Sequence, residues 1–379
     1  MRSVMPVFGT RPEAIKMAPI ITALQKSADF DCIVTVTGQH REMLDQVNEL
    51  FGIVPDHDLN ILQQRQSLSA IMTRTIDGLD KLFSANRPDA VIVQGDTTTS
   101  TAGAIAAFYH GIPVVHVEAG LRSGDLFSPF PEEANRKITS QISSLHLAPT
   151  SISKANLLAE GIPEDDIVVT GNTVIDALLT TVGKNIAFSD PQLEELATSG
   201  RRILLVTTHR RENQGDAMRG VGRALARIAD AEPELVIVLP AHKNPVVREA
   251  VLPALDGKSN VIVTEPLAYG EFTRMLSLAH IVLTDSGGVQ EEAPSLGKPV
   301  LVMRDNTERP EAVHAGTVRL IGTSEDRIVK EVDRLLNEPD HFDGMANAVN
   351  PYGDGRAAER TVAAVAQLLG VGMRIDSFS

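Results

Sequence analysis

The chain of 379 residues has no tryptophan, a single cysteine and only 4% aromatic residues. The lone thiol of Cys32 forms no internal disulfide and supplies no thiolate cluster for a metal ion. This cysteine usage is typical of a reducing compartment and predicts a cytoplasmic protein. Few aromatic rings leave little material for the stacking surfaces that bind single-stranded nucleic acid. Secreted scaffolds held by disulfides and stacking nucleic-acid binders are therefore disfavoured.

Long hydrophobic runs and an excess of positive charge are also lacking. Apolar runs such as 203–206 and 236–239 are far shorter than the roughly 18 residues of a membrane span, and no leader pattern opens the chain. With 35 Lys and Arg against 49 Asp and Glu the net charge is −14, so the surface repels phosphates and anionic lipid. We therefore expect no membrane and no nucleic-acid partner.

Apolar, β-branched runs alternate with helical patterns along the chain. This alternation predicts parallel strands joined by crossover helices, which is an α/β fold. Because one core stops growing at roughly 250–300 residues, we expect two domains, 1–172 and 173–360, each with a doubly wound sheet. Six strands are predicted in the first half, at 3–8, 33–37, 90–94, 114–118, 145–148 and 167–169, and six in the second, at 203–207, 236–240, 261–264, 281–284, 300–303 and 318–321. Ligands bind beyond the carboxyl ends of such strands, so the residues that follow each strand are the first candidates for a site.

The turn after the first predicted strand, FGTRPEAIK at 8–16, is a candidate anion site. Pro12 suits the first turn of a helix, whose unpaired N–H groups and partial positive charge favour anions. Arg11 and Lys16 would add full charges, although an ordinary turn with two surface cations fits about equally well. Other nucleotide signatures fail, because no G-x-G-x-x-G occurs and Leu252 replaces the first glycine of a phosphate loop ending at 257–259. Hydride transfer and ATP hydrolysis are therefore disfavoured.

Carboxylates follow successive predicted strands of the first half. Asp96 lies in QGDTTT at 94–99, Glu118 in HVEAGLRS at 116–123, and Glu132 and Glu133 open the next helix in PEEANR at 131–136. Any one of them alone would most often be a helix cap or a salt-bridged surface acid. Carboxylates that share a crevice raise one another's pKa values and so supply both an acid and a base. The group therefore predicts acid–base chemistry.

Basic residues follow strands of the second half. His209 and Arg210 lie in THRREN at 208–213, and His242 precedes Lys243 after the next strand. A lone histidine is usually structural, but two histidines beside arginine and lysine form a cationic cluster in an acidic chain. The cluster predicts an anionic ligand.

A glycine turn, DSGGVQEE at 285–292, follows another predicted strand. Ser286 and the N–H groups of Gly287 and Gly288 are predicted to hold a diphosphate, and Glu292 to take the hydroxyls of a ribose. The alternative is a plain tight turn. Arg309 is a further candidate phosphate ligand. No ligand spacing of a metal site is present, so we expect neither a metal nor another cofactor.

Taken together, nine blocks of sequence resemble the bacterial non-hydrolysing UDP-N-acetylglucosamine 2-epimerases. The blocks run from residue 8 to 312 within a match that reaches about 360, and they are FGTRPEAIKMAP, GQHREML, QGDTTT, HVEAGLRS, PEEANR, GNTVIDAL, THRREN, DSGGVQEEAPSLGKPVL and NTERPEA. The resemblance implies two Rossmann-like domains facing a cleft, as in B-type glycosyltransferases. It implies that a C-terminal helix, at about 361–379, packs back on the first domain, and the amphipathic stretch 357–369 is the candidate for that helix. It also implies a homodimer that converts UDP-N-acetylglucosamine to UDP-N-acetylmannosamine for cell-surface polysaccharides.

The resemblance further implies roles for individual residues. The catalytic group it implies is Asp96, Glu118, Glu132 and His209. Asp96, Glu118 and His209 also count among the nucleotide-sugar contacts, whose other members are Arg11, Lys16, Ser286, Gly287, Gly288, Glu292 and Arg309, with Leu267 and Phe272 against the uracil. A second, activating UDP-N-acetylglucosamine site matches Gln39, Arg65, Glu132, Arg210 and His242. Glu42 departs from the pattern, because some relatives carry glutamine there, so the affinity of this second site is expected to differ.

The implied reaction needs both acids and cations. The C2 hydrogen is not α to a carbonyl, so no base removes it until the C1–O bond to UDP breaks. Loss of UDP and of the C2 proton gives 2-acetamidoglucal, and re-addition with a proton from the opposite face inverts C2. Four alternatives remain: a glycosyltransferase of the same fold, an epimerase of a modified sugar such as a 2,3-diacetamido uronic acid nucleotide, a hydrolysing epimerase, and a UDP-sugar-binding regulator without activity.

Overall fold

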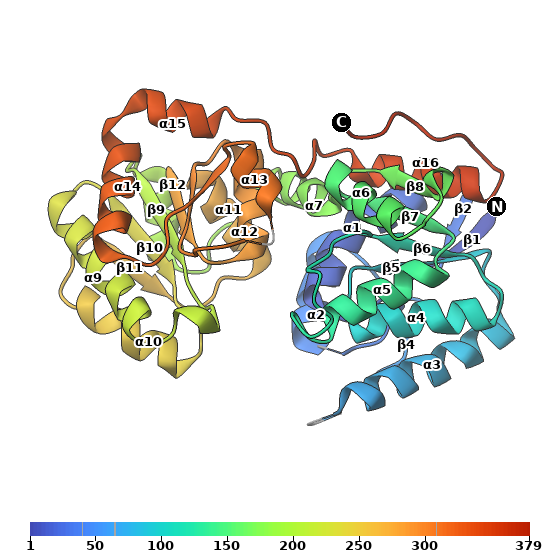
Figure 1. Ribbon diagram of the computed structural model, residues 1–379. Coiled ribbons are helices and arrows are strands. Elements are labelled where there is room, and N and C mark those ends of the chain that lie inside the picture. Colours follow the sequence, from blue (N-terminus) through green and yellow to red (C-terminus); the bar gives the residue numbers. More distant parts are fainter. Residues whose placement is uncertain (40, 64–65, 308) are drawn as a thin grey trace. The chain divides into compact units, whose positions relative to one another are not determined.

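A computed structural model describes residues 1–39, 41–63, 66–307 and 309–379. These residues form two compact units, Met1–Ala177 with Tyr352–Ser379, and Leu178–Pro351 (Figure 1). Each unit is a parallel sheet flanked by helices, which confirms the predicted α/β class. No helix in the described ranges combines the length and the apolar character that crossing a membrane requires.

The first unit is built on a sheet with strand order β4-β3-β1-β5-β6-β7-β8, and β2 pairs with β1. The strands are near-continuous apolar runs, because a parallel sheet is covered on both faces. Its strands are β1 (Arg2–Phe8), β2 (Phe30–Cys32), β3 (Thr35–Val36), β4 (His57–Asp58), β5 (Ala90–Gln94), β6 (Val114–Val117), β7 (Leu145–Ala148) and β8 (Ile167–Val169). Its helices are α1 (Arg11–Lys26), α2 (Arg41–Phe51), α3 (Leu68–Ala85), α4 (Thr98–Tyr109), α5 (Glu132–Ile142), α6 (Ser151–Ala159), the 3-10 turn η1 (Glu164–Asp166), α7 (Thr173–Val182), whose last residues belong to the second unit, and α16 (Ala357–Leu368).

Helices cover both faces of this first sheet. Figure 1 shows α3, α4 and α5 on one side of the strands and α16 on the other. On the α3 side, Met5, Val7 and Val93 of the sheet form one buried cluster with Leu79 and Phe83 of α3. On the other side α16 contacts α1 and β7. The C-terminal segment therefore completes the core of the unit that contains the N-terminus.

The strand predicted at 33–37 is wrong in its bounds. Two short strands, Phe30–Cys32 and Thr35–Val36, pair with β1 in its place. The ladder is interrupted at Val34, whose N–H donates to the Asp56 side chain at 2.7 Å and whose carbonyl accepts from the Asp56 N–H at 2.8 Å. Asp56 is followed directly by the two-residue strand His57–Asp58, which the sequence did not predict because it contains no apolar run. The six strands expected in the first half are therefore eight among the described residues.

The second unit confirms the six strands predicted for its half. Their order is β11-β10-β9-β12-β13-β14, with every neighbouring pair parallel. Leu204 and Ile237 of the sheet form a buried cluster with Leu225 and Val332 of the flanking helices. The strands are β9 (Ile203–Thr207), β10 (Val236–Pro240), β11 (Val261–Thr264), β12 (Ile281–Thr284), β13 (Val300–Val302) and β14 (Val318–Leu320). The helices are α8 (Pro191–Thr198), η2 (Arg211–Asn213), α9 (Asp216–Ala231), α10 (Pro245–Val251), η3 (Leu252–Leu255), α11 (Tyr269–Leu278), α12 (Gly287–Glu292), η4 (Ala293–Leu296), α13 (Pro310–His314), α14 (Glu325–Asn337) and α15 (Pro339–Ala346).

Candidate active site

Glu118 stands directly after β6, at the carboxyl edge of the first sheet. Its φ of 63° is left-handed, a conformation that residues other than glycine rarely adopt. Its carboxylate forms an ion pair with Lys16 of α1 and accepts hydrogen bonds from the Gln94 amide and from Asn172 Nδ2, the latter at 3.1 Å. The side chain is only 8% exposed. A nearly buried acid on strained backbone, matched by a lysine, is more typical of a functional site than of a solvated surface.

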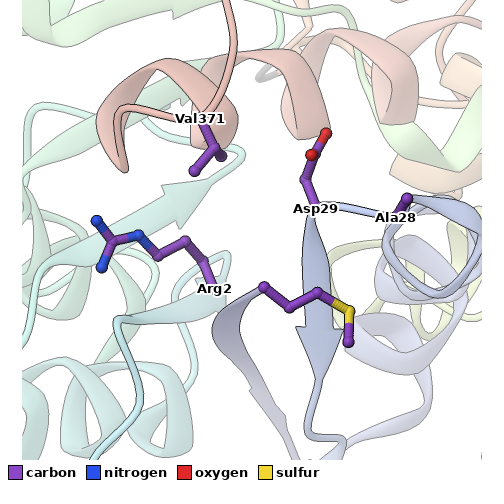
Figure 2. Close-up of a pocket in the computed structure, with 5 residues that line it drawn as sticks. Arg2, Ala28, Asp29 and Val371 are labelled. Atoms are coloured by element: carbon purple, nitrogen blue, oxygen red, sulfur yellow. The ribbon is translucent and has the colours of Figure 1, made fainter.

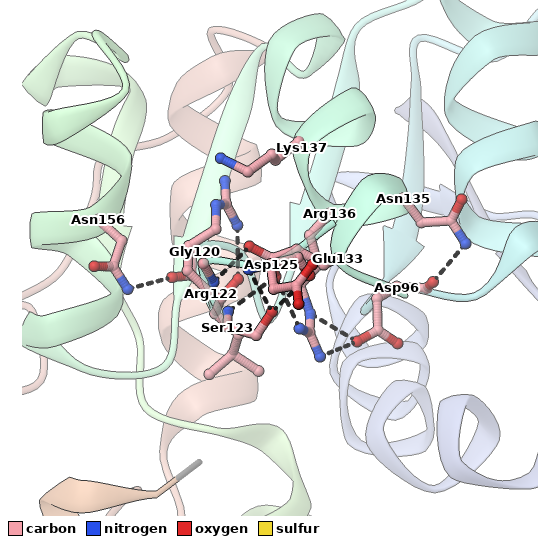
Figure 3. Close-up of polar contacts among 12 residues, drawn as sticks. Asp96, Gly120, Arg122, Ser123, Asp125, Glu133, Asn135, Arg136, Lys137 and Asn156 are labelled. Atoms are coloured by element: carbon pink, nitrogen blue, oxygen red, sulfur yellow. Dashed lines mark hydrogen bonds and ion pairs between the residues drawn. The ribbon is translucent and has the colours of Figure 1, made fainter. Parts of the chain in front are cut away.

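Asp96 follows β5 and lies beside a cation of α5. Arg136 donates to Asp96 Oδ2 from Nε at 2.9 Å and from Nη2 at 2.6 Å (Figure 3). Arg136 also pairs at 3.1 Å with Glu133, a fully buried carboxylate that accepts the N–H groups of Ser123 at 3.0 Å and Gly124 at 3.2 Å. Burial alone would raise the pKa of Glu133, but these hydrogen bonds and Arg136 outweigh it and lower the pKa. A continuous chain of charges therefore ties Asp96 to the loop between β6 and α5.

Glu132 is the first residue of α5, where the helix N-terminus favours negative charge. It is half-buried, and its buried Oε2 makes no hydrogen bond with the described residues. Buried carboxylate oxygens usually have a hydrogen-bond partner, so one that lacks a partner is a candidate to act on a ligand.

The turn between β1 and α1 is held by the buried carboxylate of Glu13. Glu13 Oε2 accepts the N–H groups of Gly9 at 3.0 Å and Thr10 at 2.7 Å, and Oε1 accepts the hydroxyls of Thr97 at 2.6 Å and Ser100 at 2.8 Å. This carboxylate therefore joins the turn after β1 to the turn after β5, which carries Asp96.

Gly9 lies close against Thr37, the residue that follows β3. A Cβ at Gly9 would lie 1.9 Å from Thr37 Oγ1, so no larger residue fits unless the Thr37 side chain is displaced. Arg11, two residues after Gly9, is exposed at the start of α1. The predicted anion site is thus a rigid turn with an exposed arginine.

Gln39, predicted for the second nucleotide-sugar site, lies at the same edge of the first sheet. Its Oε1 accepts the Thr99 hydroxyl at 2.7 Å, next to the turn that carries Asp96. Arg65 and the side chain of Glu42 lie outside the described part of the chain. Six of the predicted residues therefore stand on the segments of the first unit that follow β1, β3, β5 and β6, and two of them, Lys16 and Glu118, are in contact. The six are Arg11, Lys16, Gln39, Asp96, Glu118 and Glu132.

His209 leads the cationic group of the second unit. Its ring stacks on that of His242, with centroids 5.6 Å apart and an interplanar angle of 18°. The two rings line a pocket of about 450 Å³ at the ends of β9 and β10, whose other lining residues are Arg210, Arg211, Glu212, Gln214 and Asn244. Burial is the largest cause that lowers the pKa of His209. The proximity of Arg210 and His242 lowers this pKa further, whereas the proximity of Asp285 raises it. The pocket is rich in cations, as an anionic ligand requires.

The turn after β12 contains the remaining predicted contacts. A Cβ at Gly287 would lie 2.5 Å from Arg309 Nη1, so glycine there lets the guanidinium lie against the start of α12. Arg309 Nε also donates to Glu291 at 2.6 Å. Glu292 is buried and accepts the Tyr269 hydroxyl at 2.9 Å, and burial beside this acid raises the pKa of Tyr269. The remaining predicted contacts are Ser286, half-buried, Gly288, exposed, and Leu267 and Phe272, both half-buried at the start of α11.

The residues that hold the predicted site residues in place were largely not predicted from the sequence. Gln94, which donates to Glu118, could have been predicted, because it is the polar last residue of an otherwise apolar run. Asp285 anchors the segment of His209, but its partners Thr208 and Asn213 lie 77 and 72 positions away, so no local pattern reveals the contact.

A further pocket, of about 350 Å³, lies at the amino end of β1 (Figure 2). Its lining residues are Met1, Arg2, Ala28, Asp29 and Val371. It is at the opposite end of the strand from Gly9 and contains none of the predicted residues. Across the described ranges, no group of three or more histidine, cysteine or carboxylate side chains is arranged to hold a metal ion.

Comparison with known proteins gives a consistent result. The family model described as UDP-N-acetylglucosamine 2-epimerase matches residues 22–366. The UDP-N-acetylglucosamine 2-epimerase of Escherichia coli K12 is 53% identical over 96% of this chain and 98% of its own. That of Bacillus subtilis 168 is 52% identical over 95% and 93%.

A solved structure gives the same relationship in three dimensions. The UDP-GlcNAc 2-epimerase of Neisseria meningitidis, bound to UDP-GlcNAc, superposes with a TM-score of 0.86 at 48% identity, covering 96% of this chain and all of that one. The fold with its strand-end acids, the family model and the identities over nearly full length lead to one conclusion. The chain belongs to the UDP-N-acetylglucosamine 2-epimerase family of isomerases.

Proposed function

We propose that the protein interconverts UDP-N-acetylglucosamine and UDP-N-acetylmannosamine by eliminating UDP and adding it back. The observation that carries this proposal is the pair of acids after β5 and β6, Asp96 and Glu118, each matched by a cation. A glycosyltransferase needs the nucleotide site but needs no such group of acids near C2. The UDP-GlcNAc in the Neisseria meningitidis relative supports the choice of substrate.

In the first step the C1–O bond breaks, and both electrons leave with the β-phosphate of UDP. Cations and N–H dipoles already aimed at the pyrophosphate lower the free energy of this charge separation, typically by several kcal/mol in a closed site. We assign this role to His209, Arg309 and Arg11, with the turn at Ser286, Gly287 and Gly288. Glu292 is assigned to the ribose, and Leu267 and Phe272 to the uracil.

In the second step a carboxylate takes the C2 proton, and a C1–C2 double bond forms to give 2-acetamidoglucal. The reverse steps return a proton to the opposite face of C2 and reconnect UDP to C1. Two faces require more than one acid or base, which Asp96, Glu118 and Glu132 supply. Lys16 forms an ion pair with Glu118, and Arg136 forms one with Asp96, so a cation lies beside each of these two acids.

One NMR experiment tests the reaction. The protein is incubated with UDP-N-acetylglucosamine in D₂O, and the products are followed by proton NMR. We expect UDP-N-acetylmannosamine with deuterium at C2. Retention of hydrogen at C2 through many turnovers excludes proton exchange, transfer to an added acceptor indicates a glycosyltransferase, and free N-acetylmannosamine indicates a hydrolysing enzyme.

Positional isotope exchange tests the order of the steps. Substrate with ¹⁸O in the bridge between C1 and the β-phosphorus is incubated with the protein. If UDP departs and returns, the label moves into non-bridging positions of the β-phosphate. A label that stays in the bridge while C2 is inverted rules out elimination of UDP.

Four further properties belong to the same proposal. A second, activating UDP-N-acetylglucosamine would be bound by Gln39, Arg65, Glu132, Arg210 and His242. The product of the reaction would supply cell-surface polysaccharides. The protein would act in the cytoplasm as a homodimer. Sigmoidal initial rates against substrate concentration, made hyperbolic in a His242→Ala variant, and a dimer mass in light scattering are the expected results.

A further inference from the structure

Asp285 is a fully buried carboxylate directly after β12. It accepts the Thr208 hydroxyl at 2.9 Å, the N–H groups of His209 at 2.9 Å and Arg210 at 3.0 Å, and the Asn213 side-chain amide at 3.2 Å. These donors all lie in the segment that follows β9. One carboxylate thus fixes the backbone of the segment that presents His209.

The same carboxylate also contacts the ring of His209. Asp285 Oδ1 lies 3.3 Å from His209 Nδ1, and His242 stacks on the ring. A ring nitrogen facing a carboxylate carries a hydrogen, because the carboxylate can only accept. Nε2 is then the nitrogen left to exchange a proton with a ligand in the pocket.

We infer that Asp285 is a positioning residue that sets the tautomer and orientation of His209 and favours its protonated form. The inference rests on the proposed function, in which protonated His209 receives the departing pyrophosphate. An imidazolium stabilises a phosphate oxygen more strongly than a neutral ring does, since the hydrogen bond is then charge-assisted.

The other charged groups around His209 show why a carboxylate is needed there. Arg210 from the same segment and His242 from the turn after β10 both lower the pKa of His209, and burial lowers it more than either. Arg211 and Glu212 also line the pocket. Asp285 is the group from the neighbouring strand that counteracts this loss of basicity.

The wild-type protein gives the first test, which does not depend on turnover. Protein labelled with ¹⁵N in histidine is titrated by NMR, and the His209 signals are identified by their loss in a His209→Gln variant. We expect the neutral ring to carry its hydrogen on Nδ1. A neutral ring protonated on Nε2 overturns the inference even if the protein proves to be an active epimerase.

The second test compares Asp285→Asn with Thr208→Val. Asp285→Asn keeps the shape but removes the charge, so we expect the pKa of His209 to fall by about one unit. We expect kcat to fall about 100-fold, KM to change little, and the alkaline limb of the kcat profile to move to lower pH. Thr208→Val loosens the same segment but keeps the Asp285 charge, and should leave the pKa of His209 unchanged.

The outcomes separate the inference from the proposed function. An Asp285→Asn protein that folds and keeps the His209 pKa overturns the inference, as does an equal pKa loss in Thr208→Val. If Asp285→Asn does not fold, the tautomer of the wild type decides. A His209→Gln protein with wild-type kcat instead removes His209 from the proposed reaction and leaves the Asp285–His209 geometry untouched.

Discussion

The loops after the strands of the first sheet present acids that cations hold, whereas those of the second sheet present cations that an acid holds. In the first unit Lys16 pairs with Glu118 and Arg136 with Asp96. In the second unit Asp285 gathers the segment of His209. Two sheets of the same class can therefore serve opposite chemistry, because the strand ends supply positions and the residues there supply the charge.

Removing an acid from the strand ends of the first sheet should have the largest effect on kcat. We expect Asp96→Asn and Glu118→Gln each to lower kcat by about 10³-fold with the fold intact, because general acid–base catalysis commonly contributes 10²–10⁴-fold. Initial rates with UDP-N-acetylglucosamine measure kcat, and circular dichroism checks the fold. A variant with near wild-type kcat would remove that acid from the mechanism.

A substitution at the strand ends of the second sheet sharpens the contrast between the two units. His209→Asn should also abolish turnover, but through loss of leaving-group stabilisation and not through loss of a base at C2. Positional isotope exchange then separates the edges. We expect the exchange to stop in His209→Asn, while an acid variant that still scrambles the label without inverting C2 shows that UDP departure precedes proton removal.

The next largest effect concerns the cation that holds Asp96. Arg136→Met leaves the fully buried Glu133 without its cation, so we expect the free energy of unfolding to fall by about 3 kcal/mol. The adjacent Lys137→Met is the matched control. Lys137 is 41% exposed and contacts Glu160, which Arg122 also holds at 2.7 Å, so its loss should cost less than about 1 kcal/mol. Denaturant unfolding of both variants measures the difference, and equal losses would contradict a special role for Arg136.

How much of this arrangement the sequence predicts depends on the range of the interactions. Strand ends are local, so the apolar runs identified the edges on which Asp96, Glu118 and His209 stand. The segment 30–37 was misjudged because Val34 bonds to Asp56, a partner that no periodicity reveals. Contacts between distant turns, such as that of Asp285 with Asn213, depend on packing, so residues that hold a site are harder to predict than residues that present it.

The first unit also contains two histidines that make its stability depend on pH in the acidic range. His116 and His146 are paired in register on β6 and β7 of the first unit, and both are buried. The pKa of each lies at about 4, below the ordinary value of 6.5, chiefly because both rings are buried, and the proximity of His116 contributes to the shift of His146. The unfolded chain therefore binds protons that the fold excludes, so stability is full above pH 6.5 and is lost as the pH falls from 6.5 to 4.

We expect His146→Gln to remove about 3 kcal/mol of this acid-dependent loss, since a shift of one pKa unit corresponds to about 1.4 kcal/mol. Calorimetry of wild type and variant at pH 7 and pH 4.5 measures it. Asp176 gives a control of opposite sign. Burial raises its pKa to about 6, so its contribution is lost as the pH rises, and Asp176→Asn should make the acid loss steeper. Parallel curves for all three proteins would show that these groups do not control the acid response.

The smallest expected effect tests whether activity follows the edges or merely the stability of each unit. Ser67 caps α3 in the first unit by accepting the Ala70 N–H at 3.2 Å, and Asp190 caps α8 in the second by accepting the Gln192 N–H at 2.9 Å. Removing a cap costs about 1 kcal/mol, so Ser67→Ala and Asp190→Ala should each lower the midpoint of unfolding slightly. Neither cap touches a strand end, and we expect kcat to stay at the wild-type value. If either variant lowered kcat together with the midpoint of unfolding, global stability would explain the loss of activity, and the contrast between the acids of the first sheet and the cations of the second would lose its support.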